Sequence, residues 1–230
     1  MNESLPEFSV FPPVESALTE PNGLLAQGGD LSVEWLLDAY CHGIFPWFNP
    51  GEPILWWSPD PRMVLLPGDI RVTRSLAKRM RNGGFELRID SAFVDVMRAC
   101  GAPRDGTAGT WISEAMVAAY GRLFDAGYAH SVETWHDGRL VGGLYGVAIG
   151  RMFYGESMFS RVPDASKIAL VRLAQQLQRW EFGMIDCQME TPHLSSMGAR
   201  TIPRAAFVER LAEWVKLPHR PGPWIFDAPD

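Results

Sequence analysis

The segment from residue 130 to residue 189 constrains the fold more than any other part of the chain. Residues 131–135 alternate apolar and polar side chains and are followed by an Asp-Gly pair, which is typical of a tight hairpin turn. Residues 140–149 and 152–159 are two further strand patterns separated by a short turn, and glycines in the first of them indicate a bulge or a close backbone approach. These residues therefore predict an antiparallel meander.

A helix and a fourth strand follow the meander. Apolar side chains recur at helical spacing over residues 166–180, with Asp164 as the expected N-cap and Gly183 beyond the end. Residues 184–189 form a short, mostly apolar strand. A strand, a helix and a strand in this order form a crossover that makes the two strands parallel and is almost always right-handed. Ligands of such sheets lie beyond the carboxyl ends of the strands, so a site is expected there.

Asp186 and Gln188 are the polar residues of this last strand. Because alternate residues of a strand share a face, both side chains should point the same way. A carboxylate and an amide buried together are either a hydrogen-bonded core pair or part of a binding site. Glu156 lies near the C-terminal end of the neighbouring strand, so all three polar groups are expected at one edge of the sheet.

The order of these elements is similar to that of GNAT-type acyltransferases, but the phosphate-binding loop of the CoA-dependent enzymes is missing. Residues 160–165 lack the glycines of that loop, and Pro163 has no N–H to donate. The chain also has no Walker or dinucleotide loop and no G-x-S-x-G motif, and its five histidines are scattered. We therefore expect an acyl carrier other than CoA and no catalytic triad.

The first part of the chain is predicted to be a small separate domain. Residues 32–42 have the spacing and the end signals of a short helix. Residues 43–51 and 54–62 are aromatic runs interrupted by proline, which we expect to be neither regular helix nor central strand. Their side chains form either an apolar plug against a second domain or an aromatic wall for a stacked base. We expect one domain over residues 1–65 and a second over residues 66–230.

A basic helix is expected over residues 71–82. Arg74, Lys78 and Arg81 recur every three or four residues and so share one face. This face is either a solvated surface or a patch that contacts RNA phosphates. Trp111 precedes a helix that Ser113 should cap, and an aromatic side chain at such a junction either stacks on a ligand or covers the core.

Composition limits the class of protein. The chain has 230 residues and a net charge of −6, so any contact with nucleic acid requires a local basic patch. Its three cysteines are far apart and match no zinc spacing. This pattern favours a protein of a reducing compartment that has neither disulfides nor a metal site. The sequence shows no signal peptide and no apolar run long enough to span a membrane. We therefore expect a cytoplasmic protein with no membrane partner.

A set of long and unusual motifs is spread along the chain. They are Glu20-Pro21-Asn22-Gly23-Leu24-Leu25, Gly28-Gly29-Asp30-Leu31, Gly43-Ile44-Phe45-Pro46-Trp47-Phe48, Trp56-Trp57-Ser58-Pro59, Gly109-Thr110-Trp111-Ile112, Gly155-Glu156-Ser157-Met158-Phe159-Ser160 and Ile185-Asp186-Cys187-Gln188. Together they closely resemble the leucyl/phenylalanyl-tRNA–protein transferase family, from about residue 10 to about residue 210. The resemblance is weaker at the two termini and in the basic helix.

The resemblance implies an α+β fold with a small N-terminal domain and a GNAT-type, mixed-sheet C-terminal domain. It implies transfer of leucine, phenylalanine or methionine from aminoacyl-tRNA to proteins with N-terminal Arg or Lys, which marks those proteins for N-end-rule degradation. An aminoacyl-tRNA ester is already activated, so the reaction needs no cofactor, ATP or metal. The partners are then aminoacyl-tRNA and the acceptor protein, and we expect a monomer.

The resemblance also assigns roles to individual residues. By motif match, Asp186 and Gln188 correspond to the family's catalytic pair, and Glu156 to the residue that recognises the α-amine of the aminoacyl group. Trp47 and Trp111 correspond to contacts of the terminal adenosine. The pocket for the aminoacyl side chain would include Leu144, Met158, Leu173, Leu177 and Ile185.

Physical chemistry narrows the expected mechanism. A glutamine amide is too weakly basic to hold a proton, so Gln188 is expected to accept a hydrogen bond from the attacking amine. Asp186 would orient the Gln188 amide and stabilise the charge that forms on the amine. An apolar pocket should discriminate only weakly between leucine, phenylalanine and methionine. Two other classes stay open, namely a CoA-dependent N-acetyltransferase and a non-catalytic RNA-binding module that uses the aromatic runs and the basic helix.

Overall fold

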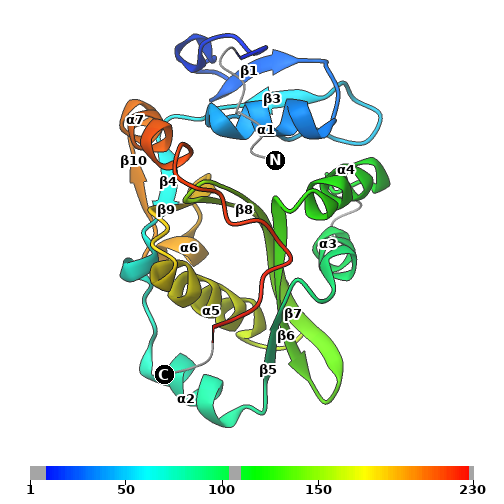
Figure 1. The fold of residues 1–230 in the computed structure, drawn as a ribbon, viewed down its shortest axis with the longest axis vertical. Coiled ribbons are helices and arrows are strands. Elements are labelled where there is room, and N and C mark those ends of the chain that lie inside the picture. The colour runs from blue at the N-terminus through cyan, green and yellow to red at the C-terminus, as the bar shows by residue number, and fades with distance from the viewer. Residues whose placement is uncertain (1–8, 104–109, 228–230) are drawn as a thin grey trace.

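The computed structural model describes residues 9–103 and 110–227, which contain two β-sheets of unequal size. A three-stranded sheet lies at the N-terminal end of the molecule, and a seven-stranded sheet runs through its centre (Figure 1). The predicted α+β class, with a small N-terminal unit and a larger mixed sheet, is confirmed. Gly109, the first residue of the motif around Trp111, lies outside the described residues.

The predicted helices and the predicted strands of the large sheet occur in the expected order, whereas the strands of the small sheet were not predicted. The helices are η1 (Val14–Ser16), α1 (Val33–Cys41), η2 (Pro67–Asp69), α2 (Arg74–Asn82), α3 (Phe93–Gly101), α4 (Glu114–Asp125), α5 (Ala165–Arg179), α6 (Pro192–Ser196) and α7 (Arg204–Trp214). The strands are β1 (Leu24–Gln27), β2 (Phe45–Pro46), β3 (Leu55–Trp57), β4 (Arg62–Leu65), β5 (Glu86–Ile89), β6 (Ala129–His136), β7 (Arg139–Ile149), β8 (Met152–Ser160), β9 (Met184–Gln188) and β10 (Arg200–Ile202).

The small sheet has the strand order β1-β3-β2. Its central strand β3 comes from the aromatic run at 54–62, so the prediction that this run avoids central strands is wrong. The prolines that flank β3, Pro53 and Pro59, lie outside it, and each strand residue therefore keeps an N–H for pairing. Pro46 lies in the edge strand β2, where proline is tolerated.

The large sheet has the strand order β10-β4-β9-β8-β7-β6-β5. Strands β5 to β8 pair in sequence order and antiparallel, as the meander prediction requires. After β8 the chain crosses through α5 and returns as β9, which pairs with β8 in parallel. The predicted GNAT-type order of meander, helix and parallel strand is thus confirmed.

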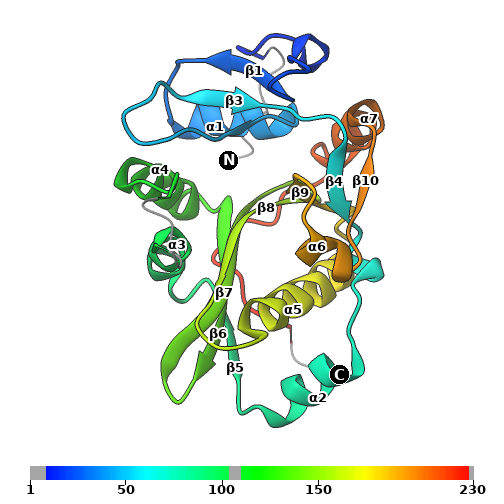
Figure 2. The same ribbon diagram turned by 180° about the vertical axis from the view of Figure 1, so that it is seen from behind.

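Helices cover both faces of the large sheet, with α5 on one face and α3 and α4 on the other (Figures 1 and 2). The alternation of β7 explains this arrangement. Its Leu144 and Ala148 belong to the core cluster that α5 completes, whereas Tyr145 and Val147 belong to the cluster that contains α3 and α4. The second cluster continues into the small domain, so one core joins the two parts of the chain.

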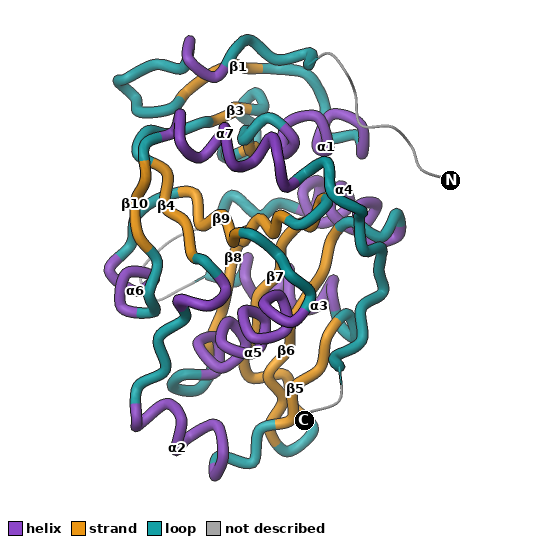
Figure 3. Tube along the Cα trace, turned by 60° about the vertical axis from the view of Figure 1, so that its left-hand side comes forward, coloured by secondary structure: helices purple, strands orange, loops and turns teal. Residues whose placement is uncertain are grey.

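Helix α7 also joins the two parts (Figure 3). Gly43, just after α1, has a φ of +74°, and a Cβ placed there would lie 2.8 Å from the Phe207 ring of α7. Strand β4 lies before the predicted domain boundary at residue 65, yet it is hydrogen-bonded between β9 and β10 in the large sheet. The boundary itself stays a prediction.

The start of α5 differs from the expectation. Asp164 occupies the N-cap position but has a left-handed φ of +65° and makes no capping hydrogen bond, so its predicted capping role is wrong. Its carboxylate instead pairs with Lys167 at 3.0 Å. The N–H of Ser166 in the first turn is satisfied by the hydroxyl of Ser160 at 2.8 Å.

Two local irregularities open the centre of the sheet. The parallel pairing of β8 with β9 ends at Tyr154 and Asp186, and the two strands separate beyond this pair. Opposite β7, strand β8 carries a bulge: Ser157 pairs with Tyr145 and Gly155 with Gly146, which leaves the residue between them unpaired. That residue is Glu156, and the bulge sets it beside the opening.

Candidate active site

A pocket opens where β8 and β9 separate, with a volume of about 220 Å³. A dry cavity of about 150 Å³ can hold benzene, so this pocket is large enough for a branched aliphatic or aromatic side chain. Its floor is mostly apolar, and Glu156 and Gln188 are the polar residues that face each other at its side. The lining residues are Leu144, Tyr145, Phe153, Gly155, Glu156, Ser157, Met158, Leu170, Leu173, Ile185, Cys187, Gln188, Met189, Thr191 and Leu194.

Four of the five side chains expected in an aminoacyl pocket line this one. Leu177 does not, because it is fully buried in the core cluster around α5. Sequence reasoning missed Leu170, although it lies three residues before Leu173 and so shares its helix face. It also missed Phe153. In a regular strand Phe153 and Met158 would point to opposite faces, and the bulge between them that brings both to the pocket cannot be read from the sequence. The four predicted residues in the lining are Leu144, Met158, Leu173 and Ile185.

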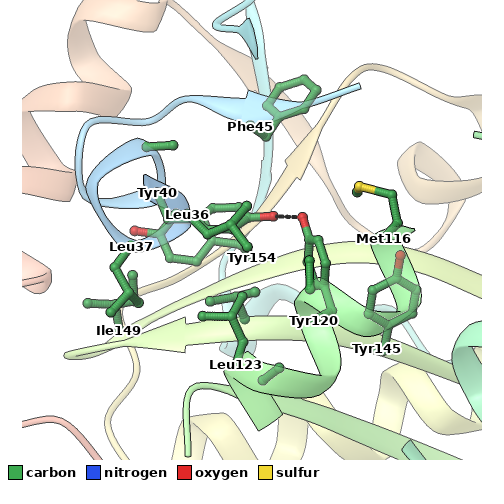
Figure 4. Close-up of a cluster of buried hydrophobic side chains, with 14 of the residues drawn as sticks. Leu36, Leu37, Tyr40, Phe45, Met116, Tyr120, Leu123, Tyr145, Ile149 and Tyr154 are labelled. Atoms are coloured by element: carbon green, nitrogen blue, oxygen red, sulfur yellow. Dashed lines mark hydrogen bonds between the residues drawn. The ribbon is translucent and has the colours of Figure 1, made fainter. Parts of the chain in front are cut away.

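The Glu156 carboxyl group is held by side chains from three other elements. Tyr40 of α1 donates from its hydroxyl to Oε1 at 2.7 Å, and Tyr120 of α4 donates to Oε2 at 3.2 Å. The two tyrosine hydroxyls are also hydrogen-bonded to each other (Figure 4). Gln188 of β9 donates from Nε2 to Oε1 at 2.9 Å. No local sequence pattern links these two tyrosines to Glu156, since they are 116 and 36 residues away.

Burial governs the charge of this carboxyl group. Burial is the main reason that the pKa of Glu156 is raised to about 7, and the neighbouring Asp186 carboxylate acts in the same direction. The hydrogen bonds from Tyr40, Tyr120 and Gln188 oppose the rise because they favour the ionised form. A carboxyl group with a pKa near neutrality can change its protonation state when a charged group binds beside it.

Gln188 leaves the strand conformation at the pocket. Its φ of +64° is in the left-handed region, which is uncommon for a residue with a side chain. The Asp186 Oδ1 accepts the main-chain N–H of Gln188 at 2.9 Å and so supports this conformation. The side-chain Nε2 is bonded to Glu156, and no donor among the described residues reaches the carbonyl oxygen of the amide. This oxygen is left to accept a hydrogen bond from a ligand.

Asp186 does not contact the pocket, because Arg62 of β4 encloses its carboxylate. The Nε of Arg62 donates to Oδ1 at 2.8 Å and its Nη2 to Oδ2 at 2.6 Å, and both side chains are fully buried. The sequence predicted that Asp186 orients the amide of Gln188. In the structure Glu156 makes that contact, while Asp186 bonds the Gln188 main chain.

Arg62 is a site residue that sequence reasoning missed. Its guanidinium lies 4.9 Å from the centre of the Phe45 ring and 4.7 Å from that of Phe207. It thus ties the small domain and α7 to the strand that carries Asp186. Its position as the first residue of an otherwise apolar strand was the available signal, because a guanidinium that is buried there requires a carboxylate partner.

Comparison with known proteins identifies the family. The family model for the leucyl/phenylalanyl-tRNA protein transferase matches residues 64–212, and that for its N-terminal domain matches residues 29–60. A leucyl/phenylalanyl-tRNA–protein transferase of Thiobacillus denitrificans is 79% identical over 99% of this chain and 100% of its own. The chain belongs to the leucyl/phenylalanyl-tRNA–protein transferase family, and it is an aminoacyltransferase.

The comparisons also found a second curated relative and a solved structure with low similarity. The leucyl/phenylalanyl-tRNA–protein transferase of Nitrosomonas europaea is 64% identical over 94% of this chain and 92% of its own. A solved structure, a GCN5-related N-acetyltransferase from Kribbella flavida, has a TM-score of 0.36 and 12% identity, over 71% of this chain and 58% of its own.

Two tryptophans expected to contact the terminal adenosine lie outside the pocket lining of this transferase. Trp47 is 41% exposed and packs edge-on against Trp57, whose ring N–H bonds the Trp47 carbonyl oxygen at 2.7 Å. Trp111 is partly buried against the core beside Ile112. An exposed ring can stack on a base, so the contact predicted for Trp47 stays a prediction, as does that for Trp111.

The three basic residues predicted to contact the tRNA backbone all lie on α2, at the far end of the sheet from the small domain (Figure 1). Lys78 lines a second pocket of about 500 Å³ together with Arg79 and His136. None of the three predicted residues lines the pocket between β8 and β9. Their role stays a prediction. They are Arg74, Lys78 and Arg81.

The described residues contain neither a metal-binding cluster nor a membrane-spanning helix. Over residues 9–103 and 110–227, no group of three or more His, Cys, Asp or Glu side chains is placed to hold a metal ion. In the same residues, no helix has both the length and the apolar character needed to cross a membrane.

Proposed function

We propose that this transferase moves leucine, phenylalanine or methionine from aminoacyl-tRNA to the α-amino group of proteins that begin with Arg or Lys. The observation that carries the proposal is the apolar pocket of about 220 Å³ with Glu156 and Gln188 at its side. The names of the relatives support the leucyl and phenylalanyl donors. Aminoacyl-tRNA is a cytoplasmic substrate, which supports a cytoplasmic location.

The donor is positioned by its amino acid. Its apolar side chain enters the pocket, where Leu144, Met158 and Leu173 contact it. Its α-amino group bonds the Glu156 carboxyl group, which places the ester carbonyl near Gln188. An apolar pocket separates side chains that differ by one methylene by only about 1–3 kcal/mol, which suits a donor range of leucine, phenylalanine and methionine.

The acceptor amine attacks the ester carbonyl beside Gln188. The free carbonyl oxygen of the Gln188 amide accepts a hydrogen bond from the amine and so aligns its lone pair with the ester. A new C–N bond forms, the C–O bond to the ribose breaks, and the ribose oxygen takes the proton that the amine loses. Positioning supplies most of the acceleration, because the ester is already activated.

Asp186 acts through the main chain in this proposal. Its charge is already matched by Arg62, so its contribution is to hold the N–H of Gln188 and with it the left-handed conformation. Cys187 also lines the pocket, but burial raises the pKa of its thiol. The thiol therefore stays protonated at neutral pH and is a poor nucleophile.

The proposed preference for acceptor proteins with N-terminal Arg or Lys rests on the negative net charge of the protein. A cationic N-terminal side chain is attracted to a protein whose net charge is −6. Transfer to such proteins would mark them for N-end-rule degradation. We include Trp47, Trp111 and the basic face of α2 in the proposal as contacts of the tRNA, with Arg74, Lys78 and Arg81 bonded to its phosphates.

A panel of acceptor peptides tests the proposal. Peptides that differ only in their first residue (Arg, Lys, Ala or Glu) are incubated with the protein and Leu-tRNA labelled in the amino acid. The Arg and Lys peptides should become labelled, whereas the Ala and Glu peptides should stay unlabelled. An N-acetylated Arg peptide should also stay unlabelled. Equal labelling of all four free peptides would contradict the acceptor assignment.

A further inference from the structure

Three oxygen-bearing groups from separate parts of the chain meet behind the pocket. They are the hydroxyls of Tyr40 and Tyr120 and the carboxyl group of Glu156, and each of the three is hydrogen-bonded to the other two (Figure 4 shows the contact between the tyrosines). Tyr40 belongs to the small domain and Tyr120 to α4. Both tyrosines are fully buried. The ring of contacts is therefore shielded from solvent on the side of the two tyrosines.

The number of protons decides the state of this ring. Each tyrosine hydroxyl brings one proton, whereas an ionised carboxylate brings none. Two protons cannot satisfy three contacts between oxygen atoms. If Glu156 is protonated, the contact between Oε2 and Tyr120 reverses and Glu156 donates to Tyr120. Tyr120 then donates to Tyr40, and Tyr40 donates to Oε1 of Glu156, which closes the ring. The contacts of the unliganded site therefore fit a neutral Glu156.

The other groups that face Glu156 agree with this state. Gln188 donates to Oε1 and remains satisfied in either form of the carboxyl group. Asp186 disfavours a second negative charge nearby, and the Nε and Nη2 of its counter-ion Arg62 donate to Asp186 and not to Glu156. Tyr145 also lies near enough to interact electrostatically with Glu156. Among the described residues, no Lys, Arg or His forms an ion pair with Glu156.

We propose that Tyr40 and Tyr120 are positioning residues for Glu156, and that the three groups form a proton-sharing ring that opens when the donor's α-amino group binds. The inference rests on the proposed function. A neutral α-amine takes the carboxyl proton and becomes an ammonium ion, whereas an α-ammonium ion displaces the proton to solvent. Both tyrosines then donate to the carboxylate. The step is a proton transfer, in which only O–H and N–H bonds are broken or formed. The small domain thereby supplies a residue without which the amine site is incomplete.

The ring predicts a direction for the pH dependence. Binding of the cationic amine requires ionised Glu156, so kcat/KM for aminoacyl-tRNA should fall as pH drops through a value near 7. Removing one tyrosine hydroxyl takes a donor away from the carboxylate and makes ionisation harder. In Tyr40→Phe and in Tyr120→Phe, the acid limb should therefore move to higher pH by about one unit.

Tyr154→Phe is the matched control. Tyr154 is fully buried, its ring lies 4.9 Å from that of Tyr40, and its hydroxyl has no hydrogen-bond partner. This variant loses a buried hydroxyl near the proton-sharing ring but removes no hydrogen bond to Glu156. The acid limb of its pH profile for kcat/KM should therefore match that of the wild type. Thermal melting confirms that each variant is folded over the pH range used.

A second measurement does not depend on transfer. The ¹³C resonance of the Glu156 carboxyl group, assigned by its loss in Glu156→Gln, is followed against pH in full-length protein. The pKa of Glu156 should rise in Tyr40→Phe and Tyr120→Phe and stay unchanged in Tyr154→Phe. An unchanged pKa in a folded Tyr40→Phe or Tyr120→Phe variant overturns the ring. Absence of transfer by the wild type at every pH would instead overturn the proposed function.

Discussion

At the scale of single residues, Asp186 has no free oxygen for a substrate. Arg62 donates to both of its oxygens, and the Gln188 N–H adds a third bond. Two charges removed from water in this way are costly to separate, because the remaining partner would be buried without compensation. We therefore propose that the pair holds Gln188 in place and does not stabilise charge on the reacting amine.

Two substitutions of Asp186 separate these effects. Asp186→Asn and Asp186→Ala should both destabilise the protein by about 3–5 kcal/mol, since each leaves Arg62 buried without a counter-ion. Asparagine keeps an oxygen for the Gln188 N–H, whereas alanine does not. At a temperature where both variants are folded, Asp186→Asn should retain more transfer activity than Asp186→Ala. Denaturant titration measures the stability, and equal transfer rates for the two variants would contradict the main-chain role.

The sequence could predict which polar residues gather at the site but not how they pair. The spacing of Asp186 and Gln188 and the crossover before them brought Glu156 to the same region, as the hydrogen bond from Gln188 to Glu156 shows. The partner of Asp186 lies 124 residues earlier, in a strand whose place in the sheet depends on non-local pairing. No local pattern encodes such a contact.

At the scale of elements, the site depends on the bulge in β8. Strand β7 faces this bulge with Gly146, where a Cβ would lie 2.2 Å from the carbonyl oxygen of Tyr154. Backbone cannot move aside as a flexible side chain can. The absence of a side chain at this position is therefore what lets the two strands come close and leaves Glu156 unpaired at the opening.

Gly146→Ala should disturb both the fold and the site. The expected loss of stability is about 1–3 kcal/mol, the usual cost of forcing extra volume into a packed core, and the transfer rate should fall because Glu156 shifts. Gly155→Ala is the comparison for stability, because its Cβ would lie 3.5 Å from the nearest backbone atom. Thermal melting of both variants checks this, and equal melting temperatures for Gly146→Ala and the wild type would refute it.

Local periodicity predicted the elements of the large sheet well and those of the small sheet poorly. The meander, α5 and β9 carry alternation or helical spacing along their whole length, and each appears within two residues of its expected position. Strands β2 and β3 have two and three residues, too few for a period to show. Their sheet exists because aromatic side chains pack around it, including Trp56, which is 1% exposed.

At the scale of the whole molecule, the small domain and the large sheet both contribute side chains to the candidate active site. Tyr40 reaches Glu156 from α1, and Phe45 packs on the guanidinium of Arg62. The sequence predicted two domains, and it left open whether the aromatic runs form a plug or a ligand surface. Trp56 is buried in the shared core, whereas Trp47 is exposed, so different tryptophans of these runs have different environments.

We propose that the reaction occurs at the opening between β8 and β9, with the Gln188 amide aligned to the attacking amine. Gln188→Asn tests it most directly, because asparagine tolerates the left-handed φ of +64° and keeps an amide but withdraws it by one methylene. A displacement of this size should lower the single-turnover rate of phenylalanine transfer from Phe-tRNA to an Arg peptide by about a hundredfold. The melting temperature should change little. A folded Gln188→Asn variant that transfers at the wild-type rate would contradict the claim.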